Sequence, residues 1–146
     1  MTDNERLAEL LFPNISWTPQ QYEEQYPARQ LPEWARVTRF SPSPTGYLHI
    51  GGLFAAMTAR LTAKATSGVF FLRIEDTDKK REVEGGVTAI VTGLAAFGIT
   101  PDEGITGLGT ESGVYGPYQQ SKRREIYQCF AKELVRQGLA YPCFCT

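Results

Sequence analysis

The pattern of apolar and polar positions predicts a strand, a helix and a second strand in the middle of the chain. Residues 37–40 form a short strand-like run, and residues 69–72 are all apolar, as expected for a strand covered on both faces. Between them, residues 50–66 are compatible with a helix. Its apolar stripe is made of residues that recur four positions apart: Leu53, Met57 and Leu61. Two strands joined by a helix are expected to lie parallel, with a right-handed crossover.

The rest of the pattern predicts two more helices, a loop and one more strand. Residues 83–97 and 122–137 are expected to be helical, and a glycine follows each of them. The buried face of the second helix is expected to contain Ile126, Cys129, Phe130 and Leu134. Residues 104–116 are glycine-rich and lack periodicity, which predicts a flexible loop. Residues 139–144 are expected to form a strand.

The first 35 residues predict a helical arm. Three leucines have helical spacing in a short segment that ends at Pro13. Thr18 is predicted to cap a second helix, because a proline follows it and a glutamine stands three residues after it. Tyr22 and Tyr26 would then share one face of that helix.

The composition is that of an ordinary soluble globular domain. The chain has 146 residues, 42% of them hydrophobic and 21% charged, with a net charge of −1. With this net charge, the chain has no overall positive field that would attract nucleic acid, so only local basic patches could bind it. We interpret the basic run at 79–81 as a solvated surface, and favour a surface role and an RNA contact equally for 122–124. No secretory leader or membrane span is apparent, and the odd number of cysteines (three) fits a reducing cytoplasm best.

Residues 39–52 carry the strongest functional signal. The end of a strand is followed by a loop stiffened by two prolines, by a turn at Gly46 and by His49, where a helix is expected to begin. The first turn of a helix presents unpaired N–H groups and a partial positive charge, which suit an anionic ligand. Parallel sheets bind ligands at the carboxyl ends of their strands. This loop and the loop after Ile74 are therefore expected to line one cleft.

Three blocks of the sequence resemble one family of enzymes. Residues 39–52 are similar to the HIGH motif of class I aminoacyl-tRNA synthetases, and residues 39–46 narrow the resemblance to the glutamyl enzymes. Residues 71–78 and 116–121 are similar to two further blocks of that family. The blocks keep the family order over roughly residues 34–146, and three collinear matches are far more specific than one. The resemblance implies an α/β fold, with a Rossmann-like parallel sheet, flanking helices and an incomplete catalytic core.

The resemblance also implies a division of the chain. We expect a helical arm at 1–35, the first half of a nucleotide- and glutamate-binding domain at 36–138, and at 139–146 the start of a strand that leads into an acceptor-binding insertion. The family's lysine-rich KMSKS-type loop and an anticodon-reading domain do not occur in the sequence. We therefore expect an N-terminal piece of a longer enzyme that is inactive, or nearly so, in aminoacylation.

The activity implied by the resemblance is ATP-dependent activation of L-glutamate and its transfer to the acceptor end of tRNA(Glu). ATP, with Mg²⁺ bound to it, is expected at Ser41, Pro42, Thr45, Gly46, His49, Gly51 and Gly52. Glutamate is expected at Arg39, Ser41, Ser43 and Glu75. His49 is the expected catalytic residue and donates hydrogen bonds to the phosphates as negative charge develops there. Arg39 would bind a substrate carboxylate through its planar guanidinium, and Glu75 would lie near the α-ammonium group.

Acidic residues and cysteines outside these sets are open to more than one interpretation. Asp76 and Asp78 could hold Mg²⁺, but we favour a structural role in which Asp76 orients Arg73 or caps the next helix. Cys143 and Cys145 stand where some family members begin a zinc site. A structural zinc needs four ligands, so this pair would be a half-site only, and buried inert thiols are an equal alternative. The thiol of a third cysteine, at position 129, is expected to be buried and inert.

The sequence is also compatible with three other functions. A shortened relative, of the glutamyl-queuosine tRNA(Asp) synthetase type, shares the pocket signature, although the long arm and the 104–116 loop favour the full synthetase. A non-catalytic synthetase-like module that binds nucleotide, RNA or protein is a second alternative. A nucleotidyltransferase of the same superfamily is a third, which the combination of Arg39 with Glu75 disfavours. No membrane or DNA partner is expected.

Overall fold

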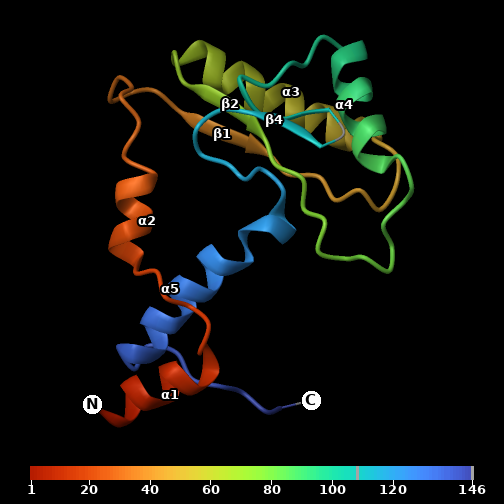
Figure 1. Cartoon of the computed structure of the whole chain (residues 1–146). Coiled ribbons are helices and arrows are strands. Elements are labelled where there is room, and N and C mark those ends of the chain that lie inside the picture. The colour runs from red at the N-terminus through yellow and green to blue at the C-terminus, as the bar shows by residue number, and fades with distance from the viewer. Residues whose placement is uncertain (108, 146) are drawn as a thin grey trace. The chain divides into compact units, whose positions relative to one another are not determined.

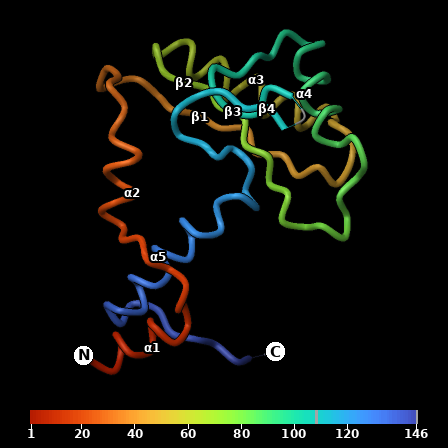
Figure 2. Tube along the Cα trace, in the orientation of Figure 1, coloured from red at the N-terminus to blue at the C-terminus, as the bar shows by residue number. Residues whose placement is uncertain are grey.

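The computed structural model describes residues 1–107 and 109–145, which form two compact units (Figures 1 and 2). One unit is Arg29–Lys122, which contains the sheet. The other combines Met1–Ala28 with Arg123–Thr146, and is helical. The boundaries expected at residues 35 and 138 stay a prediction.

The sheet is built on the expected strand–helix–strand unit. Strand β1 (Val37–Phe40) pairs in parallel with β2 (Val69–Leu72), so that Val37 lies opposite Val69 and Phe40 opposite Leu72. Helix α3 (Ile50–Ala65) connects the two strands and packs against both of them. These three elements confirm the strands at 37–40 and 69–72 and the helix at 50–66, the last to within one residue at its end.

Two more strands extend the sheet and correct the loop expected at 104–116. Strand β3 (Glu103–Gly107) pairs in parallel with β2, and the short β4 (Thr110–Ser112) pairs antiparallel with β3, giving the order β1-β2-β3-β4. The sheet is therefore mixed at one edge. Gly104 has a φ of +118°, and a Cβ there would lie 2.1 Å from the carbonyl oxygen of Leu72. This glycine allows the two strands to approach closely; it does not mark a loop.

The core lies between the sheet and its helices. Helix α4 (Gly86–Ala96) packs against β3 and begins three residues later than expected, because Gly85 before it adopts a left-handed conformation. The largest fully buried apolar side chains come from β2, α4 and the segments after them: Phe70, Leu72, Ile74, Ile90, Leu94 and Ile99. On the opposite side of β2, the ring of Phe71 lies 6.2 Å from that of Tyr118. Both faces of β2 are therefore covered.

The helical unit consists of α1 (Asp3–Leu11), α2 (Pro19–Gln25) and α5 (Arg124–Arg136), the last preceded by a 3₁₀ turn at Gln120–Arg123. Both α1 and α2 pack against α5. The cap expected at Thr18 is present as a reciprocal capping box with Gln21, and the rings of Tyr22 and Tyr26 stack with centroids 6.5 Å apart. No helix among the described residues is long and apolar enough to cross a membrane.

Two expectations for the end of the chain were wrong. Residues 139–145 form no strand, and the amides of Leu139 and Ala140 instead donate to the carbonyl of Leu134 at the end of α5. On α5 itself, Cys129 is buried as expected and so is Val135, whereas Phe130 and Leu134 are exposed. An apolar residue at helical spacing does not by itself show which neighbour covers it.

Candidate active site

The loop after β1 is held in place by the loop after β2. Three backbone amides donate to it: Arg73 N to Phe40 O at 3.0 Å, Glu75 N to Pro42 O at 3.0 Å, and Val83 N to Pro44 O at 2.8 Å. The two loops at the carboxyl ends of these parallel strands are therefore hydrogen-bonded to each other. Parallel sheets bind ligands at this edge.

A cavity of about 320 Å³ lies in this loop. The residues that line it are Phe40, Pro42, Ser43, Thr45, Gly46, Tyr47, Leu48, His49, Gly52 and Ile90. They include five of the seven positions expected to bind ATP, together with Ser43 from the expected glutamate set. Ser41 and Gly51 do not line the cavity. Lining is not ligand binding, so the assignment of these residues to ATP stays a prediction.

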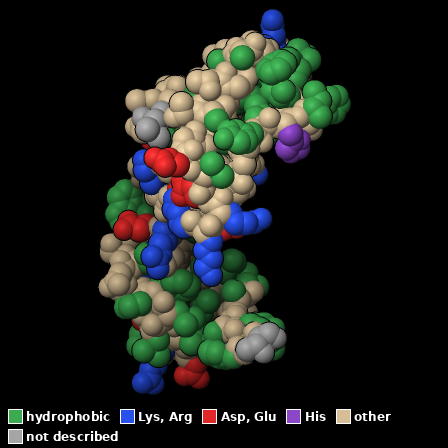
Figure 3. All heavy atoms as spheres, turned by 90° about the vertical axis from the view of Figure 1, so that its right-hand side faces the viewer, with side chains coloured by type: hydrophobic (Ala, Val, Ile, Leu, Met, Phe, Trp, Pro, Cys, Tyr) green, Lys and Arg blue, Asp and Glu red, His purple; other side chains and the backbone are tan. Residues whose placement is uncertain are grey.

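His49 is the N-terminal cap of α3, and its side chain is exposed (Figure 3). Its Nδ1 accepts a hydrogen bond from the amide of Gly51 at 3.2 Å. An imidazole that accepts at Nδ1 carries its proton on Nε2, so this atom is the donor left for a ligand. A Cβ on Gly51 would lie 3.0 Å from Cε1 of His49, so a larger residue there would crowd the ring.

Arg39 and Glu75 lie near each other at the ends of neighbouring strands. Nη2 of Arg39 is 4.0 Å from Oε1 of Glu75, and Nη2 of Arg73 is 3.0 Å from the same oxygen. The Arg39 side chain is 42% exposed, so it is accessible from solvent. The structure thus brings together the guanidinium and carboxylate expected to bind opposite ends of an amino acid.

Asp76 has a different role from the one expected. It does not contact Arg73, which pairs with Glu75, and it does not cap the next helix, α4. It accepts instead from the amide of Ser121, at the start of the 3₁₀ turn Gln120–Arg123. Its carboxylate is 1% exposed and accepts hydrogen bonds from Ser121, Gln119 and Lys79. Burial would raise the pKa of Asp76, but these hydrogen bonds outweigh that effect and hold the pKa well below its usual range.

The third sequence block, at 116–121, is joined to the same edge of the sheet. The amide of Ile74 donates to the carbonyl of Tyr118 at 2.9 Å, and the amide of Gln120 donates back to the carbonyl of Ile74 at 2.9 Å. All three blocks of the resemblance are therefore linked by backbone hydrogen bonds around the loop after β2.

Sequence reasoning missed a partly buried ion pair that supports the third block. Both guanidinium nitrogens of Arg29 reach the carboxylate of Glu103, at 2.5 and 2.7 Å, and the hydroxyl of Tyr118 donates to the same group at 2.7 Å. The pKa of Glu103 is lowered, chiefly by the hydrogen bond from Arg29. Burial, together with the bond to Glu103, raises the pKa of Tyr118 to about 12. No motif marks Arg29, because its partner lies 74 residues away.

The cysteines form no metal cluster among the described residues, where no group of three or more potential ligands occurs. Cys143 and Cys145 are exposed. The pKa of the Cys143 thiol is lowered, mainly by a hydrogen bond from the backbone of Cys145 and to a lesser extent by one from its side chain. The zinc half-site stays a prediction. Cys129 is buried, and burial raises the pKa of its thiol, as expected for an inert residue.

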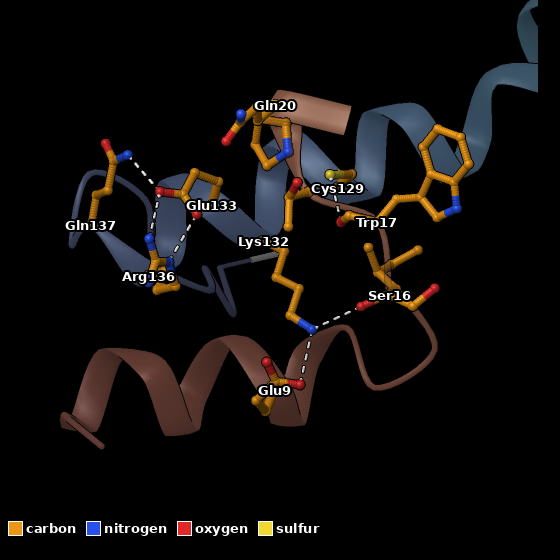
Figure 4. A pocket seen from close by; sticks show the side chains of 12 residues that line it. Glu9, Ser16, Trp17, Gln20, Cys129, Lys132, Glu133, Arg136 and Gln137 are labelled. Atoms are coloured by element: carbon orange, nitrogen blue, oxygen red, sulfur yellow. Dashed lines mark hydrogen bonds and ion pairs between the residues drawn. The ribbon is translucent and has the colours of Figure 1, made fainter. Parts of the chain in front are cut away.

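A larger cavity, of about 750 Å³, lies in the helical unit (Figure 4). Its charged side chains are paired: Lys132 binds Glu9 at 2.9 Å, and Arg136 binds Glu133 at 2.8 Å. The thiol of Cys129 donates to the carbonyl of Trp17. None of the residues expected to bind ATP or glutamate lines this cavity. We therefore assign it no part in the chemistry.

The sheet topology, the loop at the carboxyl ends of its strands and the histidine-capped helix define a class I aminoacyl-tRNA synthetase core. In agreement, the family model "tRNA synthetases class I (E and Q), catalytic domain" matches residues 36–146. The chain belongs to this family.

Curated relatives point to the glutamyl branch of the family. A glutamate–tRNA ligase of Clostridium perfringens (strain 13 / Type A) is 54% identical over 142 residues, covering 97% of this chain and 26% of the relative. One from Acetivibrio thermocellus is 51% identical over 145 residues, covering 99% of this chain and 26% of the relative. The chain thus spans about a quarter of the length of the relatives that it matches.

A solved structure gives the same result. A glutamate tRNA ligase from Elizabethkingia meningosepticum, in complex with its amino acid, has a TM-score of 0.63 and 44% identity, covering 71% of this chain and 20% of that one. The expected fold class and family are confirmed.

Proposed function

We propose that this chain forms the first part of the catalytic domain of a glutamate–tRNA ligase, which activates L-glutamate with ATP and transfers it to the acceptor end of tRNA(Glu). The proposal rests on one observation. The cavity that His49 lines is linked to the Arg39–Glu75 pair by the hydrogen bond from Glu75 N to Pro42 O. In this proposal, a site for a polyanion adjoins one for a zwitterion.

The proposed first step is attack by a glutamate carboxylate oxygen on the α-phosphorus of ATP. The new P–O bond forms as the bond to the pyrophosphate oxygen breaks, and pyrophosphate leaves. Nε2–H of His49 donates to a phosphate oxygen on which negative charge develops, and the N-terminus of α3 adds its partial positive charge. The protein contributes positioning and charge stabilisation.

Glutamate is proposed to lie between oppositely charged groups. Arg39 would bind a carboxylate through two parallel N–H···O bonds, and Glu75 would accept from the α-ammonium group. Ser43, which lines the cavity, would supply a hydroxyl. A substrate of this kind is expected to shorten and strengthen the contacts made by Arg39, whose 4.0 Å approach to Glu75 leaves room for a better partner.

The acidic residues of the loop after β2 do not fit a Mg²⁺ site. The oxygens of Asp76 accept hydrogen bonds from three residues, and Oδ2 of Asp78 is 2.6 Å from Nε of Arg81. Both carboxylates would have to give up these partners to bind a metal ion. Any Mg²⁺ is therefore proposed to arrive on the phosphates of ATP, and no step is assigned to it.

The test uses a chimaera in which this chain replaces the matching segment of the Clostridium perfringens relative. Glutamate-dependent exchange between ATP and pyrophosphate is measured, with glutamine and alanine as control amino acids. We expect exchange with glutamate only. An inactive but folded chimaera would refute the proposal.

The substrate assignment is tested with Arg39→Ala in the same chimaera. Removal of a charged hydrogen-bonding group is expected to raise the KM for glutamate by about tenfold or more, with the KM for ATP little changed. The control is Arg36→Ala, an exposed arginine immediately before the start of β1. An unchanged glutamate KM in the Arg39 variant would show that another residue binds the substrate.

A further inference from the structure

The carboxylate of Asp76 is buried and accepts four hydrogen bonds from its neighbours. Oδ1 accepts from the amide of Ser121 at 2.9 Å. Oδ2 accepts from the hydroxyl of Ser121 at 2.6 Å, from Nε2 of Gln119 at 2.8 Å and from Nζ of Lys79 at 2.9 Å. Four donors thus hold a residue that is only 1% exposed. Asp76 is therefore not accessible to a substrate, although it directly follows a proposed substrate residue.

These bonds join two distant parts of the chain. Gln119 and Ser121 lie 43 and 45 residues from Asp76 in sequence. They belong to the third sequence block, and Asp76 belongs to the second. The backbone bonds of Ile74 to Tyr118 and Gln120 run beside this side-chain link. The carboxylate of Asp76 thus anchors the segment that contains Glu75 to the third sequence block.

Glu75 itself is held on the other side by the first block. Its amide donates to the carbonyl of Pro42, and its carboxylate lies between Arg73 and Arg39. The backbone of Glu75 is thus held on one side by Pro42, which lines the cavity, and on the other by the hydrogen bonds of the adjacent Asp76. A shift of Asp76 would displace the Glu75 backbone, and with it the 4.0 Å separation from Arg39.

We propose that Asp76 is a positioning residue for the amino-acid subsite: by binding Gln119 and Ser121 it sets the placement of Glu75 towards the α-ammonium group of the substrate. This inference rests on the proposed function. It assigns Asp76 to glutamate recognition and not to ATP or metal binding. The His49 side of the cavity is held by the bond from Val83 N to Pro44 O and by the His49 cap of α3, neither of which involves Glu75, so it should be less affected.

The test compares Asp76→Asn and Ser121→Ala in the active chimaera, by ATP–pyrophosphate exchange. An amide at position 76 would point an NH₂ group at one set of its present donors, whichever way it is turned. Loss of the Ser121 hydroxyl removes one bond and keeps the others. We expect the KM for glutamate to rise about tenfold or more for Asp76→Asn and about threefold for Ser121→Ala, with the KM for ATP and kcat changed less than about twofold.

The control is Ser112→Ala, an exposed serine on β4, and the unfolding midpoint of every variant is measured. Equal rises in both KM values, or no rise in either, would overturn the inference while leaving the proposed function intact. If Asp76→Asn fails to fold, Ser121→Ala decides by the same criterion. A wild-type chimaera without exchange would instead refute the proposed function itself.

Discussion

At the scale of single residues, His49 has one observed role and one proposed role, which a simple alanine substitution cannot separate. Nδ1 caps α3 by accepting from Gly51, and Nε2–H is proposed to donate to the phosphates. Loss of the cap alone costs about 0.5–2 kcal/mol of stability. Loss of a donor to a developing charge costs about 3–4 kcal/mol of transition-state stabilisation, or roughly a hundred- to a thousandfold in rate.

We therefore predict that His49→Ala in the chimaera lowers kcat for exchange about a hundredfold or more. His49→Asn is the matched variant, because asparagine is a good N-terminal cap but its amide is shorter than the imidazole. It is expected to restore the unfolding midpoint and not the rate. Recovery of the rate along with stability would show that the histidine acts only as a cap.

The sequence predicted those site residues that occur in contiguous motifs. Pro42, Gly46 and His49 could be placed together because a strand, a turn and a helix start follow one another within a few residues. The proximity of Arg39 and Glu75 follows from parallel pairing, which aligns the ends of β1 and β2. The partners of Asp76 could not be predicted, because periodicity carries no information about contacts across more than 40 residues.

At the scale of elements, the β3–β4 hairpin shows where pattern reasoning fails. Its glycines broke the alternation of apolar and polar residues and predicted a loop. In the structure, Gly104 is buried against β2, in a conformation that only glycine adopts easily. Close approach of two backbones requires glycine just as some turns do. The sequence alone cannot distinguish a glycine in a turn from one packed against a neighbouring strand, because it does not show the neighbouring strand.

The third block rests on this hairpin through the Arg29–Glu103–Tyr118 cluster. We predict that Arg29→Ala destabilises the chain by about 2 kcal/mol at pH 7, the scale of one hydrogen bond to a charged group, because the pair is partly exposed and water replaces part of the lost interaction. The guanidinium also lies 3.9 Å from the ring centroid of Tyr115, and that contact would be lost as well. Urea unfolding of the chain measures the effect, and the exposed Arg36→Ala is the control.

The pH dependence of this difference follows from the lowered pKa of Glu103. A carboxyl group whose pKa is lower in the folded than in the unfolded chain adds stability above its unfolded pKa of about 4.3, and loses that contribution as pH falls through the folded pKa. The gap between wild type and Arg29→Ala should thus be complete at pH 7 and shrink below about pH 4. A gap of constant size down to pH 3 would show that Glu103 is not the relevant partner.

At the scale of the whole molecule, the candidate site is open to solvent. His49 is exposed, and three large apolar side chains within five residues of it in sequence are exposed as well: Tyr47 at 82%, Ile50 at 80% and Phe54 at 73%. Catalytic electrostatics of the proposed kind depend on a site from which water is excluded. The relatives have about three-quarters of their length outside the part matched by this chain.

We therefore predict that the chain alone, unlike the chimaera, gives no detectable glutamate-dependent exchange and no charging of tRNA, although it folds. We expect this because the proposed interactions of Arg39, Glu75 and His49 with ATP and glutamate would be weakened by water in an open site. Exchange and charging are measured for both proteins at equal concentration, with circular dichroism to show that the chain is folded. Charging of tRNA by the chain alone would mean that residues 1–146 already enclose a complete site, and the weakening role given to solvent here would then be wrong.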